Sequence, residues 1–216
     1  MKEWLKVRWV FIGLVVLHGA ALLVTYYDLL NTFKIYKANE VIIQFITFEV
    51  VFYSKVKYVS LLTGLGIGIF QFFPELNQSR LKLTLHLPVK ENKLIFQMAA
   101  TGAALLIVLS VFDVCILSLI TLKFLPREFF DSMVTTTLPW YLGSLCSYFW
   151  VMIVFIEPGW VKRILMAIVG IGIVSLFFEG GGYAMYAPSL LYIGVLTFLS
   201  GAIIFLSAFN FKRGIW

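Results

Sequence analysis

The chain alternates between long apolar runs and short polar intervals, a pattern typical of proteins built from membrane-spanning helices. A hydrocarbon core of about 30 Å needs about 20 helical residues, and six runs approach that length. They cover residues 9–26, 54–73, 94–122, 133–156, 162–178 and 189–209. In lipid only helices or closed barrels satisfy their backbone groups, and barrel strands alternate apolar and polar residues over about 10 positions. We therefore expect an all-α fold with six spans in one membrane domain, residues 1–216.

Composition and charge agree with a membrane protein. Hydrophobic residues make up 61% of the chain and charged residues 13%, and the mean hydropathy of +0.96 lies well above that of soluble domains. A net charge of +6 would suggest a nucleic-acid partner in a soluble protein. Here the cations flank the expected spans, where membrane insertion and anionic headgroups account for them. We expect lipid as a partner and no nucleic acid.

The distribution of Lys and Arg predicts the orientation in the membrane. Cytoplasmic loops carry an excess of cations, and placing both termini in the cytoplasm puts the larger set there. The cytoplasmic set is Lys2, Lys6, Arg8, Arg80, Lys82, Lys90, Lys93, Lys162, Arg163, Lys212 and Arg213, and the outer set is Lys34, Lys37, Lys55, Lys57, Lys123 and Arg127. We therefore expect cytoplasmic N- and C-termini.

The longest polar interval, residues 74–93, lies between the second and third apolar runs and reads PELNQSRLKLTLHLPVKENK. Residues 80–87 alternate strictly, which by period alone favours a strand. An isolated strand between two helices would have no partner for its backbone, whereas Pro74 and Pro88 are placed to begin and end a short helix. We therefore predict a short cytoplasmic helix in this interval.

Two segments that we expect on the outer side of the membrane also have recognisable sequence patterns. Polar residues at near-helical spacing within residues 40–57 predict an interfacial helix that leads into the second span. Three glycines at positions 180–182, followed by Pro188, break the helix between the fifth and sixth runs. That break is either a plain turn or a short re-entrant element.

Asp113 is the one acidic residue deep inside an expected span. Because a buried carboxylate is costly, one interpretation is a role in transport or gating. The interpretation that we favour is a packing role, with the side chain neutral or hydrogen-bonded to a neighbour such as Ser110 or a tyrosine on a facing helix. His18 is expected to be a satisfied interior histidine, because no histidine or carboxylate lies three or four residues away to form a helical metal site.

Small residues and cysteines complete the candidates inside the spans. Gly64 and Gly68 form one GxxxG pair, and Gly170 and Gly172 lie in the fifth run. Such glycines serve either helix packing within the chain, which we favour, or a subunit interface or pathway. Two cysteines, Cys115 and Cys146, lie within expected helices and read as buried inert thiols, with no metal site and no disulfide framework.

The polar interval resembles a known family motif. Permease subunits of type-two ATP-binding-cassette exporters carry, after their second span, a segment of the form E-R-x-x-G-T-L-x-L-L-L-x-x-P-V-S-R. In this chain the residues that match without a gap are Glu75, Leu81, Leu83, Leu85, Pro88 and Val89. Ser79 and Arg80 stand in place of the Gly-Thr pair, and Glu91 stands where arginine is usual. The likeness is strongest to the small bacterial permeases that work with a separately encoded ATPase.

This resemblance implies a function and partners. The segment would be the coupling helix of an exporter, seated in a cleft of the ATPase, and its contact residues would be Glu75, Asn77, Arg80, Lys82, His86 and Lys90. Two ATPase subunits would hold ATP and Mg, and this chain would bind no cofactor. A second permease copy would complete a homodimer in the bacterial inner membrane. The pathway between the copies would be lined mainly by the second and fifth spans, and the candidate residues are Gly64, Gly68, Asp113, Gly170 and Gly172.

The residues themselves leave other classes open. No GxxxxGK[ST] stretch occurs in the sequence, so energy for transport would come from another subunit. A scaffold or assembly subunit of a membrane complex fits the composition, as does a secondary carrier. An intramembrane enzyme is less favoured, because two histidines and one deep acid provide no acid/base or nucleophile constellation and thus no catalytic residues.

Overall fold

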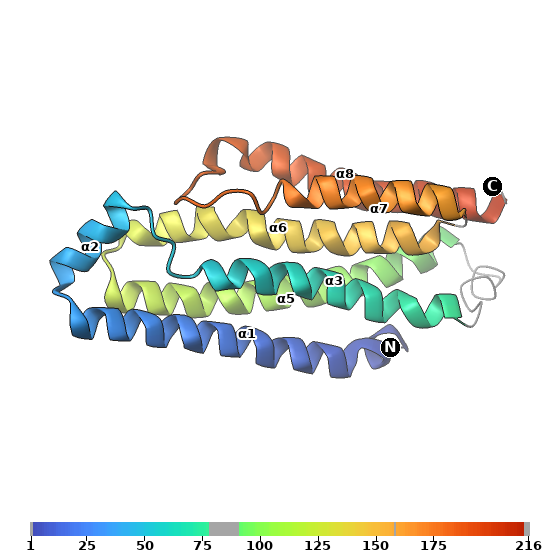
Figure 1. Ribbon diagram of the computed structural model, residues 1–216. Coiled ribbons are helices and arrows are strands. Elements are labelled where there is room, and N and C mark those ends of the chain that lie inside the picture. Colours follow the sequence, from blue (N-terminus) through green and yellow to red (C-terminus); the bar gives the residue numbers. More distant parts are fainter. Residues whose placement is uncertain (1, 78–90, 158, 214–216) are drawn as a thin grey trace.

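The computed structural model describes residues 2–77, 91–157 and 159–213, and within these ranges it contains helices and turns but no strand (Figure 1). The long helices are α1 (Lys2–Ile35), α3 (Ser54–Asn77), α5 (Glu91–Phe124), α6 (Glu128–Ile156) and α8 (Leu190–Arg213). Shorter elements are α2 (Ala38–Thr47), α7 (Trp160–Ser175) and the 3-10 helix η1 (Ala187–Ser189). The all-α prediction is confirmed for the described part of the chain.

Five helices in the described ranges are long and apolar enough to cross a membrane. Their candidate spans are Trp4–Ile35, Ser54–Pro74, Lys93–Phe124, Glu128–Ile156 and Ala187–Ile204. Large apolar side chains also point outward, among them Trp9 at 71% and Phe198 at 76% exposure. The chain therefore has the build of a multi-pass membrane protein. The fifth expected span, residues 162–178, corresponds to α7, whose 16 residues rise only about 24 Å, so six crossings stay a prediction.

The long helices run back and forth between two ends of the bundle (Figure 1). At one end, here called the N/C end, α1 and α7 begin, α8 ends, and the described parts of α3 and α5 stop on either side of residues 78–90. At the opposite end, the loop end, lie α2 and the connection from α7 to α8. Both termini thus share one end, as the orientation argument requires. Which end faces the cytoplasm stays a prediction.

Helix α6 is the centre of the bundle because it contacts α3, α5, α7 and α8, while α1 packs on α3 and α5. Its buried face carries small residues, including Gly143, Ser144 and Ser147, which allow neighbouring backbones to approach closely. The closest approach is that of α3, where Gly64 lies against the backbone of Ser144 and the side chain of Ser147. In a membrane the hydrophobic effect does not drive helices together, so close van der Waals packing at small residues stabilises their contacts instead.

Two boundaries differ from the sequence prediction. Helix α3 runs through Pro74 to Asn77, so Pro74 lies inside the span helix and does not begin a separate helix. Proline is tolerated there because it lies in the last turn and neighbouring groups can satisfy the freed carbonyl. The interfacial helix expected within residues 40–57 exists as α2, but it ends at Thr47, and Glu49 has a positive φ of 48° before α3 begins.

The connection between α7 and α8 is a folded turn at the loop end. The Tyr186 hydroxyl donates to the carbonyl of Leu176 and accepts from the N–H of Gly180, both at 2.8 Å. The Tyr183 hydroxyl donates to the carbonyl of Val50 at 2.7 Å, which ties this turn to the segment before α3. Burial raises the pKa of Tyr183, so its phenol keeps the proton that it donates. Of the two expectations for this segment, the plain turn is the one found.

A pair of glycines on α3 gives a matched test of the α3–α6 packing. A Cβ at Gly64 would overlap the carbonyl oxygen of Ser144, whereas a Cβ at Gly66 meets nothing within 4 Å. We expect Gly64→Ala to destabilise the purified protein by roughly 1–3 kcal/mol, the usual cost of overpacking. Gly66→Ala should leave the thermal unfolding temperature unchanged or slightly raised. Equal unfolding temperatures for the two variants would contradict the α3–α6 contact.

The sidedness of the two ends can be tested by cysteine labelling. In a variant without Cys115 and Cys146, single cysteines at Ser79 and Gly181 should react with an impermeant maleimide from opposite sides of the membrane. Gly181 lies at the exposed loop end with open space around it, so the substitution is sterically permitted. If both cysteines were labelled from the outside of intact cells, the predicted topology would be wrong.

Candidate functional site

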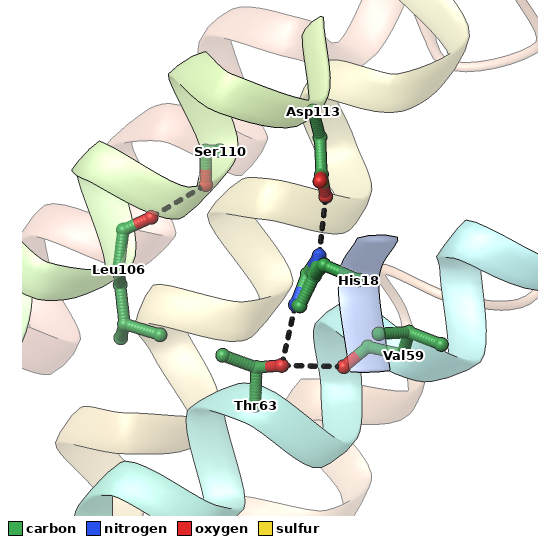
Figure 2. A network of polar contacts seen from close by, with 6 residues as sticks. All are labelled: His18, Val59, Thr63, Leu106, Ser110 and Asp113. Carbon is green, nitrogen blue, oxygen red and sulfur yellow. Dashed lines mark hydrogen bonds and ion pairs between the residues drawn. The ribbon is translucent and has the colours of Figure 1, made fainter. Parts of the chain in front are cut away.

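A polar cluster occupies the interior of the bundle where α1, α3 and α5 meet (Figure 2). Helix α1 contributes His18, α3 contributes Thr63 and α5 contributes Asp113, and their exposures are 3%, 1% and 0%. Nδ1 of His18 lies 2.6 Å from Oδ2 of Asp113, and Nε2 lies 2.7 Å from Oγ1 of Thr63. Figure 2 shows the imidazole held between the other two side chains. These three residues form the candidate site.

The heavy-atom positions admit two protonation forms of the cluster. Oγ1 of Thr63 lies 2.8 Å from the carbonyl oxygen of Val59 and 2.7 Å from Nε2 of His18, and its single hydrogen can be donated to only one of them. If it is donated to Val59, Nε2 donates to Oγ1, and the contact of 2.6 Å between Nδ1 and Oδ2 holds a further hydrogen, shared between the imidazole and the carboxyl group. If it is donated to Nε2, the imidazole is neutral and carries its hydrogen on Nδ1, which donates to the Asp113 carboxylate.

The first form gives the His18–Asp113 pair a net charge of zero, and the second gives it a net charge of minus one. An uncompensated charge at membrane depth is expensive, which favours the neutral form. A short hydrogen bond between these two groups also offsets the loss of hydration on burial. The neutral form is called the proton-loaded form of the pair.

Tyr141 on α6 approaches the pair from the remaining side. It lies close enough to Asp113 and to Tyr53 for their ionisable groups to interact. Among the described residues, Oδ1 of Asp113 and the hydroxyls of Tyr141 and Tyr53 are buried without a hydrogen-bond partner. Tyr141 is nevertheless near enough to Asp113, and Tyr53 near enough to Thr136, for a weak side-chain hydrogen bond in each case. The hydroxyls are therefore loosely held.

The sequence analysis singled out His18 and Asp113 separately but did not pair them. They are 95 positions apart and on different helices, so no local spacing connects them. The one available signal was depth, because each lies near the middle of its expected span. Ser110, suggested as a partner for Asp113, donates instead to the carbonyl of Leu106 on its own helix at 2.9 Å (Figure 2).

A second buried polar group was missed entirely. Near the N/C end, Nε2 of Gln71 donates to the carbonyl of Met98 at 2.9 Å, and the Tyr148 hydroxyl donates to Oε1 of Gln71 at 3.0 Å. The Tyr148 ring fits there because Gly102 on α5 has no side chain. This contact joins α3, α5 and α6 and satisfies the amide of Gln71, so it reads as a structural clamp.

The glycines proposed for a pathway or interface mostly face α6. A Cβ at Gly64 would overlap Ser144, one at Gly68 would lie 2.8 Å from Cγ1 of Val151, and one at Gly170 would lie 2.9 Å from the ring of Trp150. Gly172 has nothing within 4 Å. Asp113 faces α1 and does not join these glycines.

An apolar hollow of about 620 Å³ lies between α3, α6 and α7. Leu65 of α3, Val151 of α6 and Ile171 of α7 are among its lining residues, and so is Gly170. The hollow thus lies between the second and fifth expected spans. None of the three residues of the polar cluster lines it.

The residues proposed to contact an ATPase lie at the end of α3 and within residues 78–90. Glu75 and Asn77 belong to the last turn of α3, and their side chains lie outside the described part. The positions outside the described residues altogether are Arg80, Lys82, His86 and Lys90. Their proposed role stays a prediction.

Metal ligands and thiols add no further centre in the described ranges. No group of three or more His, Cys, Asp or Glu side chains gathers there. Both cysteines are unpaired and lie within helices, as expected, but only Cys146 is buried. Cys115 is exposed on α5, which differs from the expectation of two buried thiols.

No family model matches this chain, and neither a curated protein nor a solved structure is similar to it at a significant level. Its function must therefore be argued from the residues and the geometry described above.

The His18–Asp113 contact predicts a difference between two substitutions. Asp113→Asn retains a side chain that can donate to Nδ1 of a neutral His18, so thermal stability in detergent should stay close to that of the parent protein. Asp113→Ala leaves Nδ1 buried and unpaired and should cost roughly 1–3 kcal/mol or more. Ser110→Ala, which removes a bond within α5 only, is the control and should have little effect. Equal stability of all three variants would contradict the contact.

Proposed function

We propose that this chain is the transmembrane permease subunit of an ATP-driven exporter of the type-two ATP-binding-cassette kind. The observation that carries the proposal is the position of residues 74–93, whose sequence resembles the family's coupling segment. This segment leads from α3 to α5, whose described parts end at Asn77 and begin at Glu91, at the N/C end where α1 also begins and α8 ends (Figure 1). A motor bound there would act on two long membrane helices at once.

The packing of those two helices supports a lever mechanism. Helix α3 packs on α1 and α6, and α5 packs on the same two helices. A force applied between α3 and α5 would therefore reach the centre of the bundle directly. The polar cluster of His18, Thr63 and Asp113 lies at the point where α3 and α5 meet α1.

The pathway is proposed to lie along α3 and α7. These helices correspond to the second and fifth expected spans, and the apolar hollow lies between them against α6. In this proposal two copies of the chain face each other across the pathway, with α7 completing a sixth crossing. The cargo would be apolar or amphipathic where it passes this surface, because the hollow is lined almost entirely by carbon.

The energy source is proposed to be a separate ATPase, present as two subunits that hold ATP and Mg. The sequence contains no phosphate-binding loop of the GxxxxGK[ST] type. In a bacterial inner membrane with both termini inside, the N/C end would face that ATPase in the cytoplasm.

One observation favours a second candidate, a proton-coupled secondary carrier. A buried ionisable pair at membrane depth is a common feature of proton relays, and His18 with Asp113 forms such a pair. The two candidates differ in their energy source. Transport by the purified chain alone, driven by a pH gradient in vesicles, would favour the carrier.

The coupling proposal predicts the effect of a double charge reversal. Glu75→Lys with Arg80→Glu leaves the net charge unchanged and should weaken co-purification of the ATPase encoded beside this chain. Truncating or reversing a charge that is desolvated in an interface costs about 2–5 kcal/mol, whereas a rim charge costs far less. The measurement is ATPase recovery on the tagged permease, together with export in vesicles.

The matched control is Lys37→Glu with Glu40→Lys, which reverses two exposed charges at the loop end and also preserves the net charge. It should leave ATPase recovery unchanged. If the double variant at Glu75 and Arg80 kept full ATPase recovery and full export, the proposed coupling role of residues 74–93 would be wrong. A chain that never binds an ATPase would instead support the scaffold or carrier alternatives.

A further inference from the structure

The same atom positions of His18, Asp113 and Thr63 admit a neutral, proton-loaded pair and an anionic pair that has lost one proton. We propose that this pair is a proton-binding site whose occupancy controls how α1, α3 and α5 contact one another. The site comprises His18 and Asp113, with Thr63 and Tyr141 as positioning residues. This inference does not rest on the proposed ATPase partner, because it follows from the hydrogen bonds within one chain.

Release of the proton changes the cluster in a defined way. The proton leaves the contact between Nδ1 of His18 and Oδ2 of Asp113, and the net charge of the pair falls from zero to minus one. While Nε2 still donates to Thr63, the lone pair of Nδ1 would then face a carboxylate at 2.6 Å. Two responses remove that repulsion. Either α1 and α5 separate, or the imidazole proton moves from Nε2 to Nδ1 and the Thr63 hydroxyl turns from Val59 to Nε2.

Both responses involve helix contacts. The His18–Asp113 bond joins α1 to α5, and the Thr63 hydroxyl is bonded to the carbonyl of Val59 within α3. The groups that face the pair are Thr63 from α3 and Tyr141 from α6. Binding of a proton here therefore changes hydrogen bonds among α1, α3 and α5. A transport or gating step requires such a difference between two states.

A line of phenols connects the pair with the loop end. Tyr141 lies beside Asp113, Tyr53 interacts with Tyr141, and the ring centroids of Tyr53 and Tyr183 are 6.3 Å apart. Tyr183 is partly exposed in the turn between α7 and α8. Burial raises the pKa of Tyr53, so its phenol keeps a hydrogen that it can pass on.

The orphaned atoms lie along this same line. Oδ1 of Asp113 and the hydroxyls of Tyr141 and Tyr53 are the buried atoms without partners described above. Tyr141 is near enough to Asp113, and Tyr53 to Thr136, for a weak side-chain hydrogen bond only. Loosely held hydroxyl groups in consecutive side chains can turn from one partner to another, which is what a proton needs in order to move between them. The line therefore gives the pair a route to the aqueous phase at the loop end.

The decisive measurement is the protonation of His18 itself. The chain has only two histidines, so the ¹⁵N spectrum of histidine-labelled protein in lipid vesicles has few signals, and His86→Gln assigns those of His18. The pH is varied from about 4 to about 9, which covers the range in which free carboxyl and imidazole groups titrate. We expect Nε2 to bear a hydrogen at acid pH. As the pH rises, Nδ1 should lose its shared hydrogen if the helices separate, and Nε2 should lose its hydrogen if the imidazole proton moves to Nδ1.

Two results would overturn the proposal. His18 signals that do not change over the whole pH range would mean that the pair has a fixed protonation and a structural role. A spectrum with the hydrogen on Nδ1 and none on Nε2 throughout would mean that the pair is never proton-loaded. Because both are read from the parent protein, the test does not depend on whether any substitution at the cluster folds.

Matched variants test the positioning residues and the route. Thr63→Val removes the hydroxyl partner of Nε2 and should shift the pH midpoint of the His18 signals, whereas Thr101→Val, at a half-buried threonine with the same kind of bond to its own helix, should not. Tyr53→Phe should slow deuterium exchange at His18 several-fold, and Tyr27→Phe, at an exposed tyrosine, should not. An unchanged midpoint in Thr63→Val would remove Thr63 from the site, and unchanged exchange in Tyr53→Phe would overturn the route.

Discussion

The close approach of neighbouring helices to α6 is the constraint on which the rest of the bundle depends. In lipid, apolar side chains gain little by leaving one apolar surrounding for another, so helices associate where backbones can come close and dispersion contacts are dense. Two such places are Gly64 of α3 against Ser144 of α6 and Gly170 of α7 against Trp150 of α6. Because α3 and α7 are both held to α6 in this way, the hollow between them has a defined shape.

The same scarcity of water makes every buried polar group significant. Gln71 and Tyr148 satisfy one another and the carbonyl of Met98, and they stabilise the N/C half of the bundle. The cluster at His18 and Asp113 is different, because its atom positions admit a neutral and an anionic form of the pair and its neighbouring phenols are only loosely held. One polar group thus reads as a static clamp and the other as a centre that can change state.

The proposed function places these features in one sequence of events. In that proposal, movement delivered between α3 and α5 at the N/C end would reach α6, on which both helices pack, and the polar cluster, to which both contribute. A proton bound at the cluster would favour one of two helix arrangements and so bias the response to the proposed ATPase. The loop end, toward which the phenols lie, is opposite the N/C end (Figure 1).

The sequence by itself determined the helices and their approximate limits. Helix hydrogen bonds are local and apolar runs of membrane length are recognisable along the chain, so five of the six expected spans correspond to helices that can cross a membrane. The boundary at Pro74 was wrong because proline is tolerated in the last turn of α3. The tertiary structure alone decided that His18, Thr63 and Asp113 meet, because helix packing depends on the shapes of small residues such as Gly64 and these shapes leave no periodic signal along the chain.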